Sequence, residues 1–471
     1  MSGVGEYLAD VTLGVTHPDD LPKPKIKKRT QNFAKRPCPD CGYSARRHDR
    51  RTRTLHHLGD PGSGRPVDVE LRYSVHYCCK CKKYFSANTG HIADPHSHYT
   101  HEVVALAVRV VVEDGLPYRG ASWHLWRDHR VFVPFSTIQK WIEASGKKIR
   151  AKIETREYFD WAFENFSGYI AVDELYDGPF CVLSIVDNHE YKRLTYRVLD
   201  HDPKHDDIRE LFRSFRDILK QRNLKLCGVT TDGSPLYPEP IAEIFPGVRH
   251  QICEFHVKKE INKSILKAVA QVRRKLEKTK TKRNKRGRPT TKEDKATIRK
   301  NERIQAKIGA LFEHRYLFVQ KILTPKERAK LREITKGLPE LRKLREIVDE
   351  VYRLYDRRCR TQRAVEKLRK LRLRVKRFKA LSQSLAKLES PTLEKSLEFL
   401  DDKLLPSTSN AVERGNRRHR KMQKSVYRVR TRRHIENRIA LDMFRDLMLP
   451  HRFSTNHTLH YARCGSLSPF L

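Results

Sequence analysis

The feature that most constrains the fold is a repeated Cys-x-x-Cys motif near the N-terminus. Its four cysteines are Cys38, Cys41, Cys78 and Cys81. Two thiolates at this spacing converge on one ion, and two such motifs complete the tetrahedral sulfur cage that structural zinc prefers. Between the motifs, Val67–Val75 alternates in the manner of a β-strand. We therefore predict a zinc ribbon over residues 36–95, held together by a structural Zn²⁺.

Other interpretations of these cysteines remain open. Cys79 lies inside the second motif and could replace Cys78 as a ligand, or all four could be free structural thiols. The 471-residue chain has ten cysteines, which do not form a disulfide framework in a chain of this length. In a reducing compartment, paired cysteines of this kind more often bind metal.

Neither a signal peptide nor a membrane span is evident in the sequence. Residues 1–20 lack a basic start followed by an apolar core. The most apolar run, Val103–Val112, contains Arg109 and is shorter than the ~20 residues that cross a bilayer. We therefore expect a soluble, cytoplasmic protein without a membrane partner.

The charge of the chain points to a polyanionic partner. Lysine and arginine number 98 against 57 aspartates and glutamates, which gives a formal net charge of +41. An excess of this size favours nucleic acid first and an anionic membrane second. Residues 1–35 contain Pro22, Pro24 and a basic run from Lys25 to Arg29. These residues discourage regular structure, so we predict a flexible basic arm there.

Three amphipathic segments follow the cysteine motifs, over His101–Glu113, Pro117–Trp126 and Ser136–Lys148. The last segment has apolar residues on one helical face, whereas Gln139 and Lys140 lie on another. This order is typical of a helix-turn-helix, whose last helix enters the major groove of DNA. We predict such a domain over residues 96–155, with Gln139 and Lys140 contacting duplex DNA. An ordinary three-helix packing unit is the alternative.

Two aspartates stand at the ends of predicted buried strands. Tyr169–Val172 runs into Asp173, and Leu224–Thr231 runs into Asp232. The strands Phe180–Val186 and Tyr191–Val198 and the helix Asp206–Leu219 are predicted between them. Three strands, a helix and a further strand predict a mixed sheet over residues 165–265. Either aspartate alone could simply accept hydrogen bonds in a turn.

Together, the two aspartates suggest a metal site. Two carboxylates ~4 Å apart repel by about 4 kcal/mol at an effective dielectric constant of ~20, and a divalent cation removes this repulsion. Two Mg²⁺ or Mn²⁺ ions ~3.5–4 Å apart can clamp the attacking and leaving oxygens of a phosphodiester. Such a site normally needs a third carboxylate.

Glu413 is the best candidate for the third carboxylate, because it lies near the start of a predicted helix that is otherwise strongly basic. Asn410 and Glu413 also have the spacing of a capping box, so Glu413 could serve only to begin that helix. Glu436 is the competing acid, but Ile435 and Ile439 beside it indicate a packing face.

Two basic segments are predicted to contact DNA. The first follows Glu413 and contains Arg417, Arg418 and Arg420. The second contains Arg286 and Arg288 in a Lys-Arg-Gly-Arg-Pro sequence, which resembles an AT-hook that lies along a narrow A·T minor groove. A solvated basic loop is the alternative for the second segment. It belongs to residues 266–400, which we predict to be an all-helical insertion.

The order of these motifs resembles the DDE transposases, in particular the bacterial insertion-sequence and Mutator-like groups with an N-terminal zinc ribbon. The matching residues are Asp173, Asp232 and Glu413, together with Cys253-x-x-His256 after the second aspartate. Glu174 beside Asp173 is also seen in such enzymes. No role is assigned to Glu174, Cys253 or His256: the last two could bind zinc with further ligands such as Cys227 and Cys359, support the structure or contact the DNA end.

The resemblance implies a multidomain α+β protein. Its catalytic domain would have an RNase H-like α/β fold over residues 165–265 and 401–450, interrupted by the helical insertion and followed by a tail at 451–471. It also implies recognition of terminal inverted repeats, two-metal hydrolysis of phosphodiesters and transfer of a 3′-OH into target DNA. The expected assembly is a homodimer or higher oligomer on double-stranded DNA, in a prokaryotic cytoplasm and associated with the nucleoid. A transposase-derived regulator without catalysis and an RNase H-like nuclease are the rival interpretations.

Overall fold

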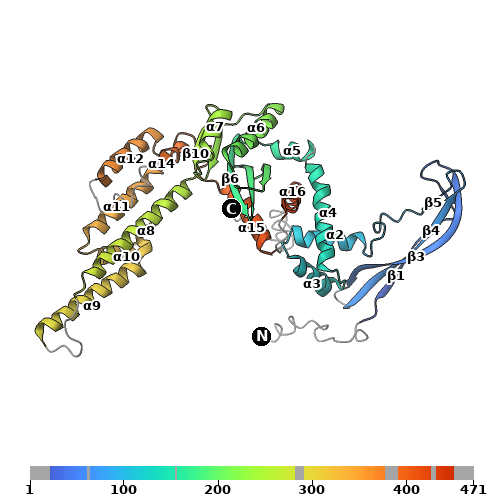
Figure 1. Ribbon diagram of the computed structural model, residues 1–471, viewed down its shortest axis with the longest axis horizontal. Coiled ribbons are helices and arrows are strands. Elements are labelled where there is room, and N and C mark those ends of the chain that lie inside the picture. The colour runs from blue at the N-terminus through green and yellow to red at the C-terminus, as the bar shows by residue number, and fades with distance from the viewer. Residues whose placement is uncertain are drawn as a thin grey trace, which may run out of the picture. The chain divides into compact units, whose positions relative to one another are not determined.

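The computed structural model describes residues 22–60, 64–153, 156–281, 291–376, 391–425 and 431–449 (Figure 1). The chain divides into two compact units, Met1–Ala162 with Asn416–Leu471, and Phe163–Gly415. Together they combine helices with two sheets, which confirms the predicted α+β class.

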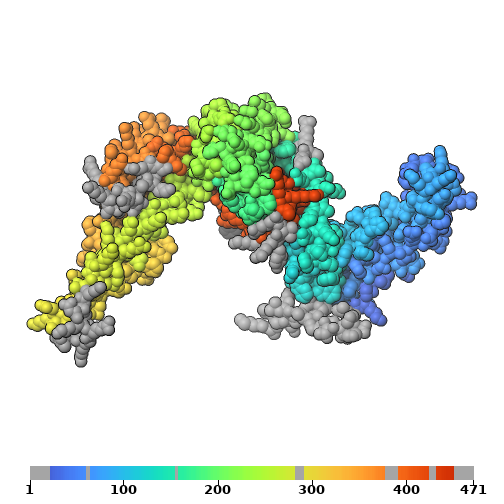
Figure 2. Space-filling view, viewed as in Figure 1, coloured from blue at the N-terminus to red at the C-terminus, as the bar shows by residue number. Residues whose placement is uncertain are grey.

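The first unit contains a sheet of five strands. They are β1 (Lys25–Gln31), β2 (Lys35–Pro37), β3 (Ser44–Asp60), β4 (Arg65–Cys78) and β5 (Lys83–Ser86). The strand order is β1-β4-β3-β2, and β5 also pairs with β4. The long strands β3 and β4 form an antiparallel ribbon, visible as a narrow blue body in Figure 2. The predicted strand at Val67–Val75 is thus confirmed as part of β4.

The prediction of a flexible arm was wrong for residues 25–31, which form the edge strand β1. This strand pairs in parallel with β4 from Lys25, opposite Val67, to Gln31, opposite Tyr73. Its lysines and arginine are exposed and so do not oppose strand formation. Charged side chains are common on edge strands, where they prevent pairing with other chains. The backbone partner comes from a distant segment, so local sequence carries no signal for it.

Helices α2 (His101–Val112), α3 (Tyr118–His129), α4 (Phe135–Ile153) and α16 (Arg432–Met448) complete the core of the first unit. The first three confirm the predicted helices. Helix α16 lies against α4 at a very close approach: a Cβ on Gly146 would meet the Cβ of Asn437 at 2.6 Å. Only glycine fits there. Helix α5 (Arg156–Phe163) leads to the second unit.

The second unit is built on a mixed sheet in the order β10-β9-β6-β7-β8. Its strands are β6 (Tyr169–Asp177), β7 (Phe180–Asp187), β8 (Arg193–Leu199), β9 (Gly228–Thr231) and β10 (Arg249–Ile252). Strands β6, β7 and β8 are antiparallel neighbours, whereas β9 is parallel to both β6 and β10. Helices α6 (His205–Gln221) and α7 (Pro238–Ile244) lie between consecutive strands. The predicted mixed sheet is therefore confirmed, with β10 as an additional strand.

Strand β6 continues past the predicted end at Val172. It pairs with β9 only from Tyr169 to Ala171, but with β7 along its whole length to Asp177. Asp173 therefore lies within β6, just beyond the end of the parallel pairing with β9. The end predicted from the sequence is close to the end of the pairing with β9. The pairing with β7 extends β6 to Asp177.

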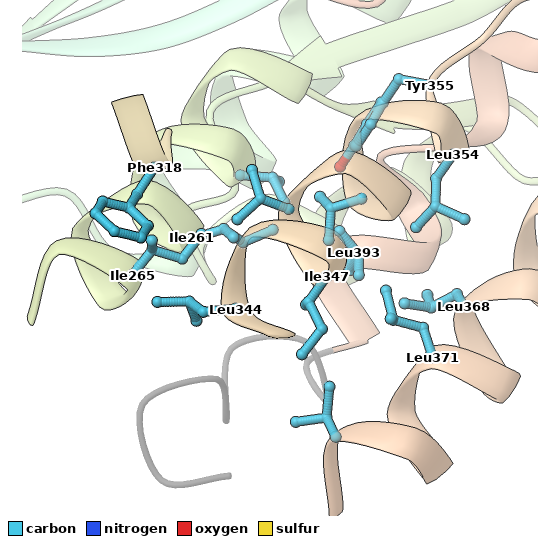
Figure 3. Packing of buried hydrophobic residues seen from close by; sticks show 14 of the residues in the cluster. Ile261, Ile265, Phe318, Leu344, Ile347, Leu354, Tyr355, Leu368, Leu371 and Leu393 are labelled. Atoms are coloured by element: carbon cyan, nitrogen blue, oxygen red, sulfur yellow. The ribbon is translucent and has the colours of Figure 1, made fainter. Parts of the chain in front are cut away.

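The rest of the second unit is helical in the residues described. Its elements are α8 (Glu254–Lys278), α9 (Lys292–Glu313), η2 (Arg315–Phe318), α10 (Pro325–Ile334), α11 (Pro339–Leu354), α12 (Thr361–Lys376), α14 (Pro391–Lys395), η4 (Glu398–Leu400) and the start of α15 (Asn410–Ser425), a helix that belongs to the first unit from Asn416. Their core contains Ile265, Phe318, Leu344 and Ile347, which are all fully or almost fully buried (Figure 3). Among the described helices, none combines the length and hydropathy that a bilayer span requires.

Candidate active site

Three carboxylates come together at the end of the β6–β9 pairing. Oxygen atoms of Asp173, Glu174 and Asp232 lie within 4.8 Å of one another. Asp173 and Glu174 come from β6, and Asp232 directly follows β9. Because β6 and β9 are parallel and adjacent, their carboxyl-terminal sides meet at this point. The structure thus brings together the two aspartates that the sequence selected, with Glu174 as the third member of the cluster.

The surroundings of Asp173 oppose its ionisation. The side chain is buried, and burial together with the negative charges of Asp232, Glu174 and Glu413 raises the pKa of Asp173 to about 8. Burial and Asp232 also raise the pKa of Glu174. A divalent cation would relieve this repulsion and take hard oxygen ligands. The donor set therefore fits Mg²⁺ or Mn²⁺.

The other two carboxylates are held by specific hydrogen bonds. The Tyr237 hydroxyl, which is fully buried, donates to Oε2 of Glu174. The backbone amide of Ser234 donates to Oδ1 of Asp232 at 2.8 Å. Asp232 therefore accepts a hydrogen bond within its turn, which is the structural role that the sequence left open for it. One of its oxygens is used in this turn, and the clustering with Asp173 is an additional feature.

Glu413 lies in the first turn of α15, in the same unit but outside the cluster of three. Buried Ala411 and Val412 pack this turn against Ala171 of β6 and Val186 of β7. The Glu413 carboxylate contacts His256, with Oε1 3.7 Å from Nε2. Its negative charge contributes to the raised pKa of Asp173. Helix α15 is therefore anchored on the strand that carries Asp173.

Glu436, the competing third acid, has structural partners. On α16 it pairs with Arg150 of α4, and with Arg432 at 3.2 Å. Its neighbours Ile435 and Ile439 are buried, as their sequence pattern indicated.

Cys253 and His256 lie where β10 passes into α8. The Cys253 amide donates to the Thr231 carbonyl at 2.7 Å, next to Asp232. Burial opposes ionisation of the Cys253 thiol, but His256 and Ser409 outweigh it and lower its pKa. Contact with Cys253 raises the pKa of His256. In the residues described, neither belongs to a group of three or more metal-ligating side chains.

The raised pKa of Asp173 predicts that the stability of the folded protein depends on pH. Between pH 4 and 8 the folded protein keeps a proton on Asp173 that the unfolded chain releases, so rising pH favours unfolding. Asp173→Asn cannot titrate. In Mg²⁺-free buffer, its melting temperature should therefore gain on the wild type from pH 5 to 8 and level off above. Melting curves of both proteins at each pH test this, and a constant difference would contradict it.

The four predicted zinc ligands also come together. The sulfur atoms of Cys38, Cys41, Cys78 and Cys81 form one cluster, with 4.0 Å between Cys38 and Cys81 and 3.6 Å between Cys41 and Cys78. A tetrahedral cage with Zn–S bonds of about 2.3 Å places its sulfurs about 3.8 Å apart, so the spacing fits zinc. Cys79 is exposed, which favours Cys78 over it as the ligand.

The backbone of both motifs turns in the same way. The residue after the second cysteine has a positive φ in each case, 71° at Gly42 and 53° at Lys82. This turn lets the two thiols of each motif face the same point, so the sequence repeat has become a structural repeat.

The residues predicted to contact DNA differ in their exposure and in the partners of their side chains. Lys140, Arg417 and Arg420 are exposed. Gln139 donates a hydrogen bond to Glu143 at 3.0 Å. Arg418 makes a bidentate ion pair with Asp446 at 2.9 and 2.8 Å, which gives it a structural role within the first unit. Arg286 and Arg288 lie outside the described residues.

Comparison with known families supports the class that this fold and acidic site indicate. A family model described as a transposase, of the DDE type, matches residues 182–439, more than half of the 471 residues. The protein is therefore a DDE transposase, as its motifs suggested. Within that class it belongs to the ISL3 family. A comparison with curated proteins finds no match. Asp232, Cys253, His256 and Glu413 lie inside the matched range, and Asp173 lies shortly before it.

Sequence reasoning missed Tyr237 and Ser234 as supports of the acidic cluster. Both lie within five residues of Asp232, in a segment without regular periodicity. Their proximity to a strand-terminal aspartate was the available signal, but a tyrosine there is equally typical of a core residue.

Proposed function

We propose that this protein mobilises a DNA element by binding its terminal inverted repeats, cleaving the phosphodiesters at its ends and joining the freed 3′-OH to target DNA. The observation that carries the proposal is the acidic cluster of Asp173, Glu174 and Asp232 in a chain of the transposase family. A DNA-binding regulator would not need three clustered carboxylates that repel one another in a protein of net charge +41.

Asp173, Asp232 and Glu413 are the proposed metal-binding and catalytic carboxylates. Bound there, two divalent cations would polarise the scissile phosphate and lower the pKa of the attacking water. The protein's own part is to hold Asp173 and Asp232 on adjacent strands and to present Glu413 from a helix packed on the same sheet. The strand order β10-β9-β6-β7-β8 is the arrangement we expect of an RNase H-like domain.

The proposed DNA-binding surfaces come from two parts of the chain that are far apart in the sequence. The zinc ribbon and the three helices after it would hold the terminal repeats, with Lys140 on the exposed face of α4. Exposed Arg417 and Arg420 on α15 would hold phosphates. Because such contacts release counterions, binding should weaken steeply with salt. We further propose a homodimer or higher oligomer that pairs two element ends in the cytoplasm, in association with the nucleoid.

The test is a cleavage assay with purified protein. Linear DNA that carries the native element with its flanks is incubated with Mg²⁺, and the products are mapped by primer extension. The proposal expects cuts at the element ends and, with added target DNA, joined products. Ca²⁺ in place of Mg²⁺ should support binding without cutting. Sequence-independent cutting of scrambled ends would instead favour a nuclease, and end binding without any cut would favour a regulator.

A further inference from the structure

Glu413 must be held at a fixed position relative to Asp173 and Asp232, which are far from it in the sequence. Asp232 and Glu413 are separated by the whole helical insertion. The packing of Ala411 and Val412 on the sheet holds the start of α15, and contacts between the two ends of the insertion add to it. Several of these contacts converge on Cys253 and His256, the pair without an assigned role.

Cys253 connects the strand that precedes Asp232 to the segment that precedes Glu413. Its amide donates to the carbonyl of Thr231, and its sulfur accepts the amide of Ser409 at 3.4 Å. The side chain is 2% exposed, so this contact is shielded from water. A second bond, from the Glu254 amide to the Ser407 carbonyl at 2.9 Å, fixes the same pair of segments.

The side chain of Gln251 in β10 makes further contacts with the end of the insertion. It is fully buried, accepts the amide of Phe399 at 2.9 Å and donates to the carbonyl of Ser396 at 2.9 Å. The last residues of the insertion are thereby tied to β10, two residues before Cys253. The segment leading to α15 is thus attached to the sheet at consecutive points.

His256 lies one helical turn after Cys253 and reaches the carboxylate itself. Its Nε2 is 3.7 Å from Oε1 of Glu413. The side chain of Glu413 is 38% exposed, so the histidine contact restricts a carboxylate that solvent would otherwise leave mobile. Partners of this kind, which orient a metal-binding carboxylate without touching the metal, are commonly needed for tight metal binding.

We propose that Cys253 and His256 are positioning residues: Cys253 fixes the backbone entering α15, and His256 orients the Glu413 carboxylate toward the metal site of Asp173 and Asp232. The proposal deepens the proposed function and rests on it for the assignment of Glu413. It gives the Cys-x-x-His motif a role in assembling the acidic site.

The test measures metal binding apart from catalysis. Mn²⁺ is titrated into the full-length protein with bound zinc, and free Mn²⁺ is followed by electron paramagnetic resonance. His256→Ala and Cys253→Ala should weaken binding about 10–100-fold. His256→Gln, which keeps an N–H donor, and Cys253→Ser, which keeps a hydrogen-bond acceptor, should recover most of it. Melting temperature and affinity for element ends should stay near wild type in these two conservative variants.

A double-mutant cycle separates positioning from general damage. In a Glu413→Gln background, His256→Ala should cause no further loss, because both changes remove the same ligand contribution. Cys227→Ala, at the opposite end of β9, is the matched thiol control and should bind Mn²⁺ normally. Unchanged Mn²⁺ binding by His256→Ala, or additive losses in the cycle, would overturn the proposal. These outcomes do not depend on cleavage, so an inactive wild type would refute the proposed function alone.

Discussion

Replacing Asp173 or Asp232 by asparagine is expected to abolish Mg²⁺-dependent cleavage of the element ends, by about 10³-fold or more. Asparagine keeps the size of the side chain but removes the charge that a divalent cation needs. Metal ions contribute several kcal/mol to phosphoryl-transfer transition states, and each 1.36 kcal/mol corresponds to a tenfold change in rate. Single-turnover cleavage of an end-labelled duplex measures the effect directly.

A melting measurement and a control variant distinguish the loss of the metal site from damage to the fold. Because Asp173 is buried among like charges, Asp173→Asn should melt no lower than the wild type at pH 8 without Mg²⁺. Asp206→Asn, an exposed acid of α6 in the same unit, is the matched control and should cut normally. Cleavage by Asp173→Asn and Asp232→Asn at the wild-type rate would reject the assignment of the acidic site.

The same assay decides which glutamate completes the site. Glu174 lies in the cluster but its Oε2 is engaged by Tyr237, whereas Glu413 lies outside the cluster of three and contacts His256. We expect Glu413→Gln to lose activity as the aspartate variants do, and Glu174→Gln to lose less. The reverse order would make Glu174 the third ligand.

Loss of zinc is expected to have the second large effect, on the fold of the first unit. Among the described residues, the ribbon has two small apolar clusters, with Leu55, Val69, Leu71 and Ala93 in one and Cys38, Ala45 and Cys78 in the other. Since structural zinc contributes about 10–16 kcal/mol in zinc-binding peptides, its removal should unfold the start of β3 and the end of β4, next to the turns of the two cysteine motifs. Hydrogen exchange of the full-length protein before and after chelation measures this.

Cys79 provides the matched control for the zinc site. Cys41→Ser should lower the zinc content from one ion per chain and expose the ends of β3 and β4 to exchange. Cys79→Ser should keep both zinc and protection, because Cys79 is exposed and outside the sulfur cluster. Retained protection in zinc-free protein would show that the ribbon folds without metal.

Local patterns predicted the elements whose partners lie nearby. The predicted helix Asp206–Leu219 is α6, and its buried residues follow the helical spacing: Ile208, Leu211, Phe212, Phe215 and Leu219. The predicted strands Tyr169–Val172 and Phe180–Val186 are neighbours in the sequence and pair as the antiparallel β6 and β7. Cysteine spacing predicted the sulfur cluster, because each motif is a local turn and only the pairing of the two motifs is distant.

Elements defined by distant backbone pairing were not predictable in the same way. Strand β1 has exposed charges along its length, and β10 carries Arg249, His250 and Gln251 in four residues. Neither shows the alternation of a half-buried strand, since each is specified by the neighbour that it pairs with. The contact of His256 with Glu413 is likewise invisible in sequence because the helical insertion separates the two residues.

Helices α15 and α16 come late in the chain, and this position affects how the protein folds during its synthesis. The first unit needs α16 to pack on α4, and the second needs the start of α15 to cover β6 and β7. A ribosome adding about 5–20 residues per second reaches these helices only after nearly all of the preceding chain has emerged. Neither unit can complete its core packing during most of translation. A chain that ends before residue 413 also lacks Glu413. The acidic site that we propose to cut DNA is therefore incomplete until synthesis is almost finished.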